Sequence, residues 1–221
     1  MNNSKIYQMP PLVFLLEDEE SQRNALTKGF KDYFSMFNEP FIPKAEHFES
    51  FPSYRPALER LMEEELKNRP LIGILDYDMS GANWDQSKKP SSALIYELDK
   101  ENEGDYDPRL ILGIIYSGQA LNAFQDPVFN QWEGDTQKYG NTGEVPILLR
   151  QSKGSASKLS EDIKLMGALI GHICSQIANT EDTTKFTDID RLAEIKKKYS
   201  PIARESNFDL YQFGNNLFKN N

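Results

Sequence analysis

Apolar residues in this sequence gather in short continuous runs, which are separated by longer segments with helical spacing. A run without polar interruption is typical of a strand that is buried on both faces of a parallel sheet. The segments with this pattern are 12–16, 71–75, 110–116 and 145–149. Segment 41–45 is a weaker candidate, and because Pro43 cannot donate a backbone hydrogen bond, we expect this strand at a sheet edge. The pattern therefore predicts five strands.

Apolar residues in the intervening and following segments recur every three or four positions, which indicates helices with one buried face. The predicted helices are 21–37, 56–66, 91–100, 160–177, 189–199 and 207–218. Strands and helices alternate, and this order predicts an α/β fold with a doubly wound, five-stranded parallel sheet and right-handed crossovers. We expect one domain over residues 1–178, followed by a helical C-terminal extension over residues 179–221.

The charge and the cysteine content exclude several functions. A formal net charge of −9 disfavours binding to nucleic acid, because phosphate groups repel an acidic surface. Lys196, Lys197 and Lys198 form the one basic cluster, and a lysine triplet on a helix is typical of a solvated face. A single cysteine, Cys174, excludes an internal disulfide, and no apolar run is long enough for a signal peptide or a membrane span. We expect a cytoplasmic protein that binds neither nucleic acid nor membranes.

Polar residues with related chemistry follow the strongest predicted strands. They are Glu17, Asp18, Asp76, Ser117 and Lys153. Ligands bind at the carboxyl ends of the strands in an open α/β sheet, so these side chains are expected to converge on one edge. Clustered carboxylates repel one another and need a cation, and Mg²⁺ prefers hard oxygen ligands of this kind. A metal beside Asp76 would also neutralise an incoming phosphoryl group, to which Ser117 could donate a hydrogen bond and Lys153 could supply a compensating charge.

The same residues resemble the pattern of bacterial response regulator receiver domains, over about residues 10–178. That pattern has an acidic pair after the first strand, a phosphoaccepting Asp after the third, Ser or Thr after the fourth and Lys after the fifth. The corresponding residues are Glu17 and Asp18, Asp76, Ser117 and Lys153. The resemblance implies a flavodoxin-like fold, with loop insertions at about 82–109 and 119–144.

The segment that follows Asp76 resembles the Asp-x-x-Met-Pro-Gly turn of the same family, with Ser80 in place of the proline. By this resemblance, Mg²⁺ would be bound by Glu17, Asp18, Asp76 and the backbone carbonyl of Asp78. It also implies a phosphorylation-dependent switch in two-component signal transduction, not a turnover enzyme, with a histidine kinase or phosphotransfer protein as its partner. The sequence leaves self-association open.

Two positions near Lys153 depart from the family pattern. Gly154 stands where the family has a proline that follows the lysine through a cis peptide bond, which is costly before any other residue. Arg150 stands where the family has an aromatic switch residue on the last strand. The coupling between the hydroxyl and the switch aromatic is therefore expected to differ, although Tyr116 lies close by in the sequence.

Two alternatives remain open at the level of sequence. A degenerate receiver would act as a protein-interaction module without being phosphorylated. A haloacid-dehalogenase-like phosphatase would use Asp76 as nucleophile and Asp78 as general acid and base, because the sequence 76–80 also resembles that family's Asp-x-Asp-x-Thr motif. A complete βαβα unit, whose first strand ends in acidic residues, precedes Asp76 and argues against the phosphatase, since the phosphatase motif normally opens the fold.

Overall fold

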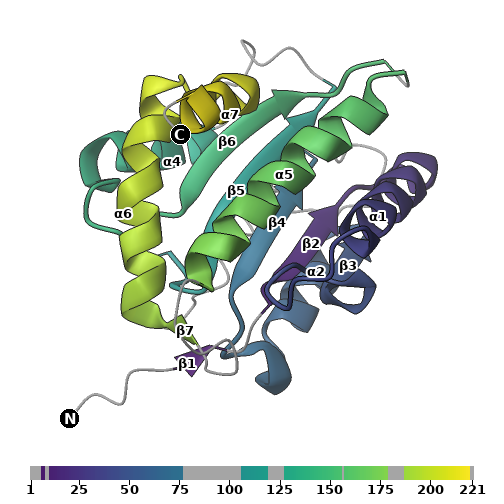
Figure 1. Ribbon diagram of the computed structural model, residues 1–221, viewed down its shortest axis with the longest axis horizontal. Helices are drawn as coiled ribbons and strands as arrows, with labels where there is room; N and C mark the ends of the chain where they lie inside the picture. The colour runs from purple at the N-terminus through teal and green to yellow at the C-terminus, as the bar shows by residue number, and fades with distance from the viewer. Residues whose placement is uncertain are drawn as a thin grey trace.

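A computed structural model describes residues 6–7, 10–76, 106–118, 127–155, 157–178 and 187–219 of the protein. Its centre is a five-stranded parallel sheet with the strand order β3-β2-β4-β5-β6 (Figure 1). The strands are β2 (Leu12–Leu16), β3 (Phe48–Phe51), β4 (Leu71–Leu75), β5 (Leu110–Ser117) and β6 (Ile147–Ser152). Counted along the chain, the order is 2-1-3-4-5, that of flavodoxin-like folds. The predicted fold class is confirmed.

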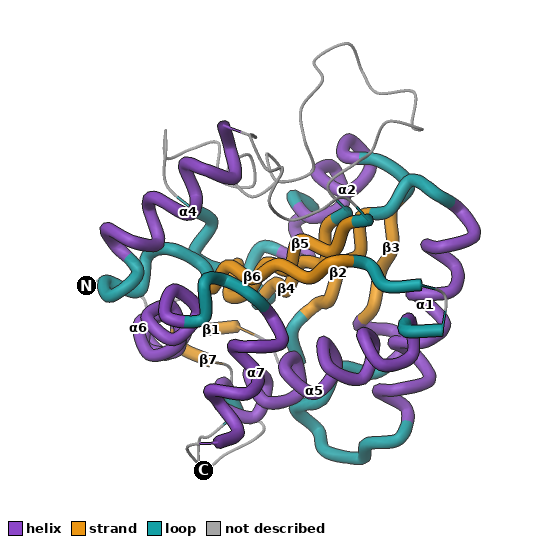
Figure 2. Tube along the Cα trace, turned by 90° about the horizontal axis from the view of Figure 1, so that it is seen from above, coloured by secondary structure: helices purple, strands orange, loops and turns teal. Residues whose placement is uncertain are grey.

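Helices cover both faces of this sheet. The helices α1 (Glu20–Ser35) and α5 (Leu159–Ile177) pack against each other on one face. The helices α2 (Tyr54–Leu61) and α4 (Pro127–Tyr139) lie on the opposite face, as seen when the sheet is viewed from above (Figure 2). Short 3₁₀ helices at Ala45–His47 and Glu64–Leu66 lead into β3 and follow α2. The sheet is therefore buried on two sides, which explains the continuous apolar runs of its central strands.

The central strands pack tightly enough to require a glycine. Every residue of β2, β4 and β5 is buried. Gly73 in β4 pairs with Phe14 in β2, and a Cβ atom at position 73 would come within 2.7 Å of the Phe14 ring. Because such a contact is sterically forbidden, glycine at this position lets the aromatic ring lie across the neighbouring strand. These strands hold the polar residues at their carboxyl ends in fixed positions.

The C-terminal helices α6 (Ile189–Glu205) and α7 (Leu210–Lys219) pack against β6 and α5, and α6 also contacts α4 and β5. Both contribute residues to the core that the sheet forms. A short antiparallel pair, β1 (Ile6–Tyr7) with β7 (Thr187–Asp188), lies beside the start of α6 (Figure 1). The helical extension is present, and it packs on the sheet domain. Among the helices that the structure describes, none is both long and apolar enough to cross a membrane.

Several predicted elements were wrong or displaced. The edge strand is Phe48–Phe51, not 41–45. The sequence pattern missed it because its two middle residues, Glu49 and Ser50, are polar and half buried, so the strand has no continuous apolar run. The last strand, β6, begins and ends later than the predicted 145–149. Helix α2 ends at Leu61, short of the predicted 66, and the expected loop at 119–144 contains α4. The helix predicted at 91–100 lies outside the described residues.

The lysine triplet is not a uniformly solvated face. Lys197 and Lys198 are exposed, whereas Lys196 has only 2% of its surface exposed. Its ammonium group lies 3.4 Å from the carbonyl oxygens of Pro108 and Glu144, in the loops before β5 and β6. The expectation of a solvated face was therefore wrong for Lys196, because α6 turns this side chain toward the amino end of the sheet.

Candidate functional site

The acidic residues lie side by side because the sheet's hydrogen-bond ladder continues past the strands that carry them. The amide of Glu17 donates to the carbonyl of Phe51 (3.1 Å), one residue beyond the end of β2. The amide of Asp76 donates to the carbonyl of Leu16 (2.8 Å), one residue beyond the end of β4. Backbone pairing therefore fixes both acids at the carboxyl edge of the sheet, where ligands bind in open α/β folds.

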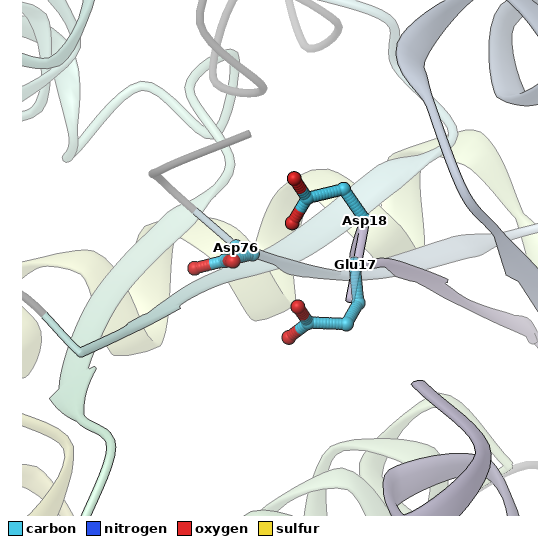
Figure 3. A group of neighbouring side chains, drawn as sticks. All are labelled: Glu17, Asp18 and Asp76. Atoms are coloured by element: carbon cyan, nitrogen blue, oxygen red, sulfur yellow. The ribbon is translucent and has the colours of Figure 1, made fainter. Parts of the chain in front are cut away.

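The side chains of Glu17, Asp18 and Asp76 form a cluster. One carboxylate oxygen from each lies within 4.8 Å of one from each of the others. Figure 3 shows Glu17 and Asp18, neighbours in the chain, both reaching toward the side of Asp76. Glu17 and Asp76 are buried, with 1% and 5% of their surfaces exposed, and Asp18 is half buried. Three carboxyl groups at this spacing repel one another unless positive charge is added.

The turn that carries the acidic pair is held by the first turn of α1. The guanidinium of Arg23 donates to the carbonyls of Glu17 (2.9 Å) and Asp18 (3.1 Å). The amide of Glu19 donates to the Glu17 carboxylate (3.2 Å). Arg23 was not singled out from the sequence, because one arginine on a helix carries no signal that it bonds to a preceding turn.

Lys153 reaches the acidic cluster from the end of β6. Its amide donates to the carbonyl of Ser117 (2.7 Å), which extends the pairing of β5 with β6. Its ammonium lies 2.7 Å from Glu17 Oε2 and 3.0 Å from Asp76 Oδ2. Ser117 is fully buried at the end of β5. The structure thus brings Glu17, Asp18, Asp76 and Lys153 together, with Ser117 hydrogen-bonded to Lys153 through the backbone.

The electrostatics of this cluster are unbalanced. Burial raises the pKa of Asp76 to about 7, helped by the carboxylates of Glu17 and Asp18 and opposed by Lys153. Burial alone would lower the pKa of Lys153, but its contacts with Asp76 and Glu17 outweigh this effect and raise it. With all three carboxyls ionised, one ammonium leaves two negative charges uncompensated. This excess adds to the effect of burial, which is the larger cause of the raised pKa of Asp76.

The donor set fits a divalent cation. Carboxylate oxygens are the ligands that Mg²⁺ prefers, and a charge of +2 matches the excess negative charge of the cluster. Glu17, Asp18 and Asp76 are the described residues that could hold the ion. The backbone carbonyl of Asp78, the fourth ligand expected from sequence, lies outside the described residues.

Arg150 forms a contact that the sequence did not indicate. Its amide donates to the carbonyl of Phe208 (2.8 Å), and its guanidinium donates to the carbonyl of Asn207 (3.0 Å). Asn207 and Phe208 both have positive φ angles (51° and 58°), which are uncommon for residues with a side chain. The segment between α6 and α7 therefore lies along the edge of β6, three residues before Lys153.

The sequence matches no family model and no curated protein. Among solved structures, a response regulator receiver domain from Rhodospirillum rubrum is similar in its chain path, with a TM-score of 0.45. Its sequence is 10% identical, and the alignment covers 80% of this chain and 99% of that chain. A likeness of this size says nothing about the residues of the site.

Proposed function

We propose that this protein is a phosphorylation-dependent signalling switch that accepts a phosphoryl group on Asp76. The observation that carries the proposal is the position of the Lys153 ammonium, which contacts the carboxylates of Glu17 and Asp76 at once. Together with Asp18, these groups form an anionic cluster at the carboxyl edge of the sheet. A carboxylate, a neighbouring ammonium and oxygen ligands for a divalent cation are the groups that phosphoryl transfer to an aspartate requires.

In the proposed reaction, an oxygen of the Asp76 carboxylate attacks the phosphorus of a donor. A new phosphorus–oxygen bond forms while the bond to the donor's leaving group breaks, and that group leaves with the bonding electron pair. Mg²⁺, when bound by Glu17 and Asp18, would neutralise charge on the phosphoryl oxygens. Lys153 would supply a further positive charge beside Asp76, and the Ser117 hydroxyl would donate a hydrogen bond to a phosphoryl oxygen. Attack by water on phosphorus later regenerates the carboxylate and releases inorganic phosphate.

The proposed donor is a phosphohistidine on a histidine kinase or phosphotransfer protein in the cytoplasm. A phosphorus–nitrogen bond would break, and the imidazole would take up a proton. Because the carboxylate is consumed once per event and restored by slow hydrolysis, the protein acts as a switch and not as a turnover enzyme. Self-association after phosphorylation is part of the same proposal.

The test is incubation of the protein with Mg²⁺ and a small acyl phosphate, followed by intact mass measurement and by assay of released phosphate. We expect one labile phosphoryl adduct in the wild type and none in Asp76→Asn. Glu20→Gln is the matched control, since Glu20 is an exposed acid close to the cluster in sequence. It should form the adduct like the wild type.

The other outcomes discriminate between the alternatives. Absence of any adduct in the wild type, with donor and Mg²⁺ in excess, would overturn the proposal in favour of a non-phosphorylated interaction module. Multiple turnover on phosphomonoesters would favour a phosphatase that uses Asp76 and Asp78.

A further inference from the structure

Asp162 is a buried acid that lies next to the candidate site without belonging to the carboxylate cluster. It stands in the first turn of α5 and has 7% of its surface exposed. The preceding residue, Glu161, is in the same turn and is exposed. An acid in a first helical turn interacts favourably with the helix dipole, and Glu161 does so from solvent. The burial of Asp162 therefore calls for a different explanation.

Three groups donate hydrogen bonds to the Asp162 carboxylate. The hydroxyl of Tyr116 donates to Oδ2 (2.9 Å), and the side-chain amide of Gln151 donates to Oδ1 (3.3 Å). The backbone amide of Gly154 donates to Oδ2 (3.4 Å). Tyr116 and Gln151 are cross-strand partners on β5 and β6, so both side chains extend from the same level of the sheet toward α5. A buried carboxylate with several donors is a stable arrangement, because its charge is compensated.

These three donors surround Lys153. Gln151 precedes it by two residues, Gly154 follows it, and the face of the Tyr116 ring lies 5.8 Å from its ammonium. Lysine has a flexible four-carbon stem, so the position of its ammonium depends on how firmly the backbone and neighbouring rings hold it. Gly154 takes the place at which a proline would make this segment rigid. A carboxylate that bonds to the chain on both sides of Lys153 provides rigidity by another route.

We propose that Asp162 is a positioning residue, whose carboxylate anchors the Lys153 segment so that the ammonium lies between Glu17 and Asp76. This proposal rests on the proposed function for its catalytic consequence, but the anchoring itself can be tested without phosphorylation. Within the described residues, the Asp162 carboxylate accepts hydrogen bonds from Tyr116, Gln151 and Gly154, so we expect its effect on phosphoryl transfer to pass through Lys153.

The first experiment detects the position of Lys153 directly, in metal-free protein. Its side-chain signal in a ¹H–¹³C spectrum is assigned by its loss in Lys153→Met. In Asp162→Asn, whose carboxamide has one acceptor oxygen for three donors, this signal should move toward that of the exposed lysines. Glu161→Gln removes the same charge from the same helical turn and should leave the signal unchanged. An unchanged signal in Asp162→Asn, with the fold intact by circular dichroism, would overturn the proposal.

The second experiment is a double-mutant cycle on the rate of phosphorylation by a small acyl phosphate. Asp162→Asn should slow phosphorylation by roughly tenfold, because a displaced group loses much of its effect on a transition state. The Kd of Mg²⁺ should not rise above its wild-type value, because a displaced ammonium repels the cation less, whereas a general loss of structure at the site would weaken binding. In the Lys153→Met background, Asp162→Asn should add nothing further, since coupled residues are non-additive. Additive losses would refute action through Lys153.

The two proposals fail in distinguishable ways. If the wild type forms no adduct, the proposed function fails, and the spectroscopic comparison of Asp162→Asn with Glu161→Gln still decides whether Asp162 positions Lys153. If the adduct forms normally in Asp162→Asn, the phosphorylation switch stands and the positioning role falls.

Discussion

The two ends of the parallel sheet each hold a lysine, half buried in the case of Lys153 and buried in the case of Lys196, and the surroundings of the two ammonium groups are opposite. At the carboxyl end, Lys153 contacts the carboxylates of Glu17 and Asp76, and these contacts raise its pKa despite burial. At the amino end, the partners of the Lys196 ammonium among the residues that the structure describes are two carbonyl oxygens, those of Pro108 and Glu144, at 3.4 Å each. Burial lowers the pKa of Lys196 to about 8, against the weaker influence of Asp107 and the Glu144 carboxylate.

The difference distinguishes a lysine of the candidate site, whose charge is matched by acids, from a buried lysine outside that site. The charge of Lys153 is matched by acids that lie at the ends of other strands, so it remains cationic at neutral pH and is available to an anionic ligand. In the described part of the chain no carboxylate forms an ion pair with Lys196, so burial works against its charge. Burial alone is therefore a poor guide to function in this protein, and the identity of the contacting atoms decides.

The amino end also contains a well-matched ion pair. Arg109 and Asp107 are nearly inaccessible, and the guanidinium donates to the carboxylate from Nε (3.0 Å to each oxygen) and from Nη2 (2.6 Å to Oδ2). The same guanidinium donates to the carbonyls of Leu61 and Leu66, which end α2 and the 3₁₀ helix after it. The ion pair therefore connects the end of α2 and the end of the following 3₁₀ helix to the start of β5.

The largest expected effect comes from breaking this ion pair. Asp107→Asn leaves a buried guanidinium without its counter-charge, and we expect a loss of about 3–5 kcal/mol in the free energy of unfolding. Urea denaturation measures it. The matched control is Glu59→Gln, which breaks the exposed pair with Arg55 and should cost less than about 1 kcal/mol. If the two variants lose similar amounts of unfolding free energy, the buried ion pair contributes no more to stability than the exposed one.

Replacing Lys196 should stabilise the fold at neutral pH, whereas breaking the Arg109–Asp107 ion pair destabilises it. Because the pKa of Lys196 in the fold is about 8, below its ordinary 10.5, its contribution to stability is full above pH 10.5 and is lost as the pH falls through 8. Lys196→Met removes that loss. The free energy of unfolding of the variant, measured relative to that of the wild type, should be about 2 kcal/mol higher at pH 7 than at pH 10.

Urea denaturation at both pH values measures this difference, and Lys197→Met, on the exposed side of α6, is the control. If Lys196→Met changes the free energy of unfolding equally at pH 7 and pH 10, burial does not oppose the charge of Lys196.

The central strands of the sheet were predictable from the sequence, whereas the edge strand β3 was not. Strands β2, β4 and β5 were predictable because burial on both faces leaves a continuous apolar run. The acids that follow them were predictable because they interrupt such runs abruptly. The edge strand β3 was not, since one side lacks a neighbour and half-buried polar residues are tolerated there.

Features that depend on packing between distant segments left no signal in the sequence. Lys196 is one of three adjacent lysines, and only the path of α6 distinguishes it from the other two. In helix α4, the buried side chains among residues 130–139 are Trp132 and Thr136, so the apolar spacing of this part of the helix is weak. Asp162 has the same first-turn position as Glu161, and the donors that set it apart come from β5, β6 and the turn after β6.

The smallest expected effect tests the carboxyl end of the sheet through its metal affinity. A proton on Asp76 competes with a cation for the carboxylate, because metal ligands must be deprotonated to bind. Since the pKa of Asp76 is raised to about 7, the carboxyl is mostly ionised at pH 8 and mostly protonated at pH 6. We expect Mg²⁺ to bind about tenfold more weakly at pH 6 than at pH 8, which corresponds to about 1.4 kcal/mol.

Titration calorimetry at the two pH values measures this change, and proton release on binding should be largest near pH 7. In Asp76→Asn, which binds the ion more weakly at all pH values, the pH dependence should disappear. A Kd that is constant from pH 6 to pH 8 in the wild type would mean that the cation does not contact Asp76. The bound cation would then not balance the negative charge at Asp76, and the contact with Lys153 would be the positive charge that the described residues place beside it.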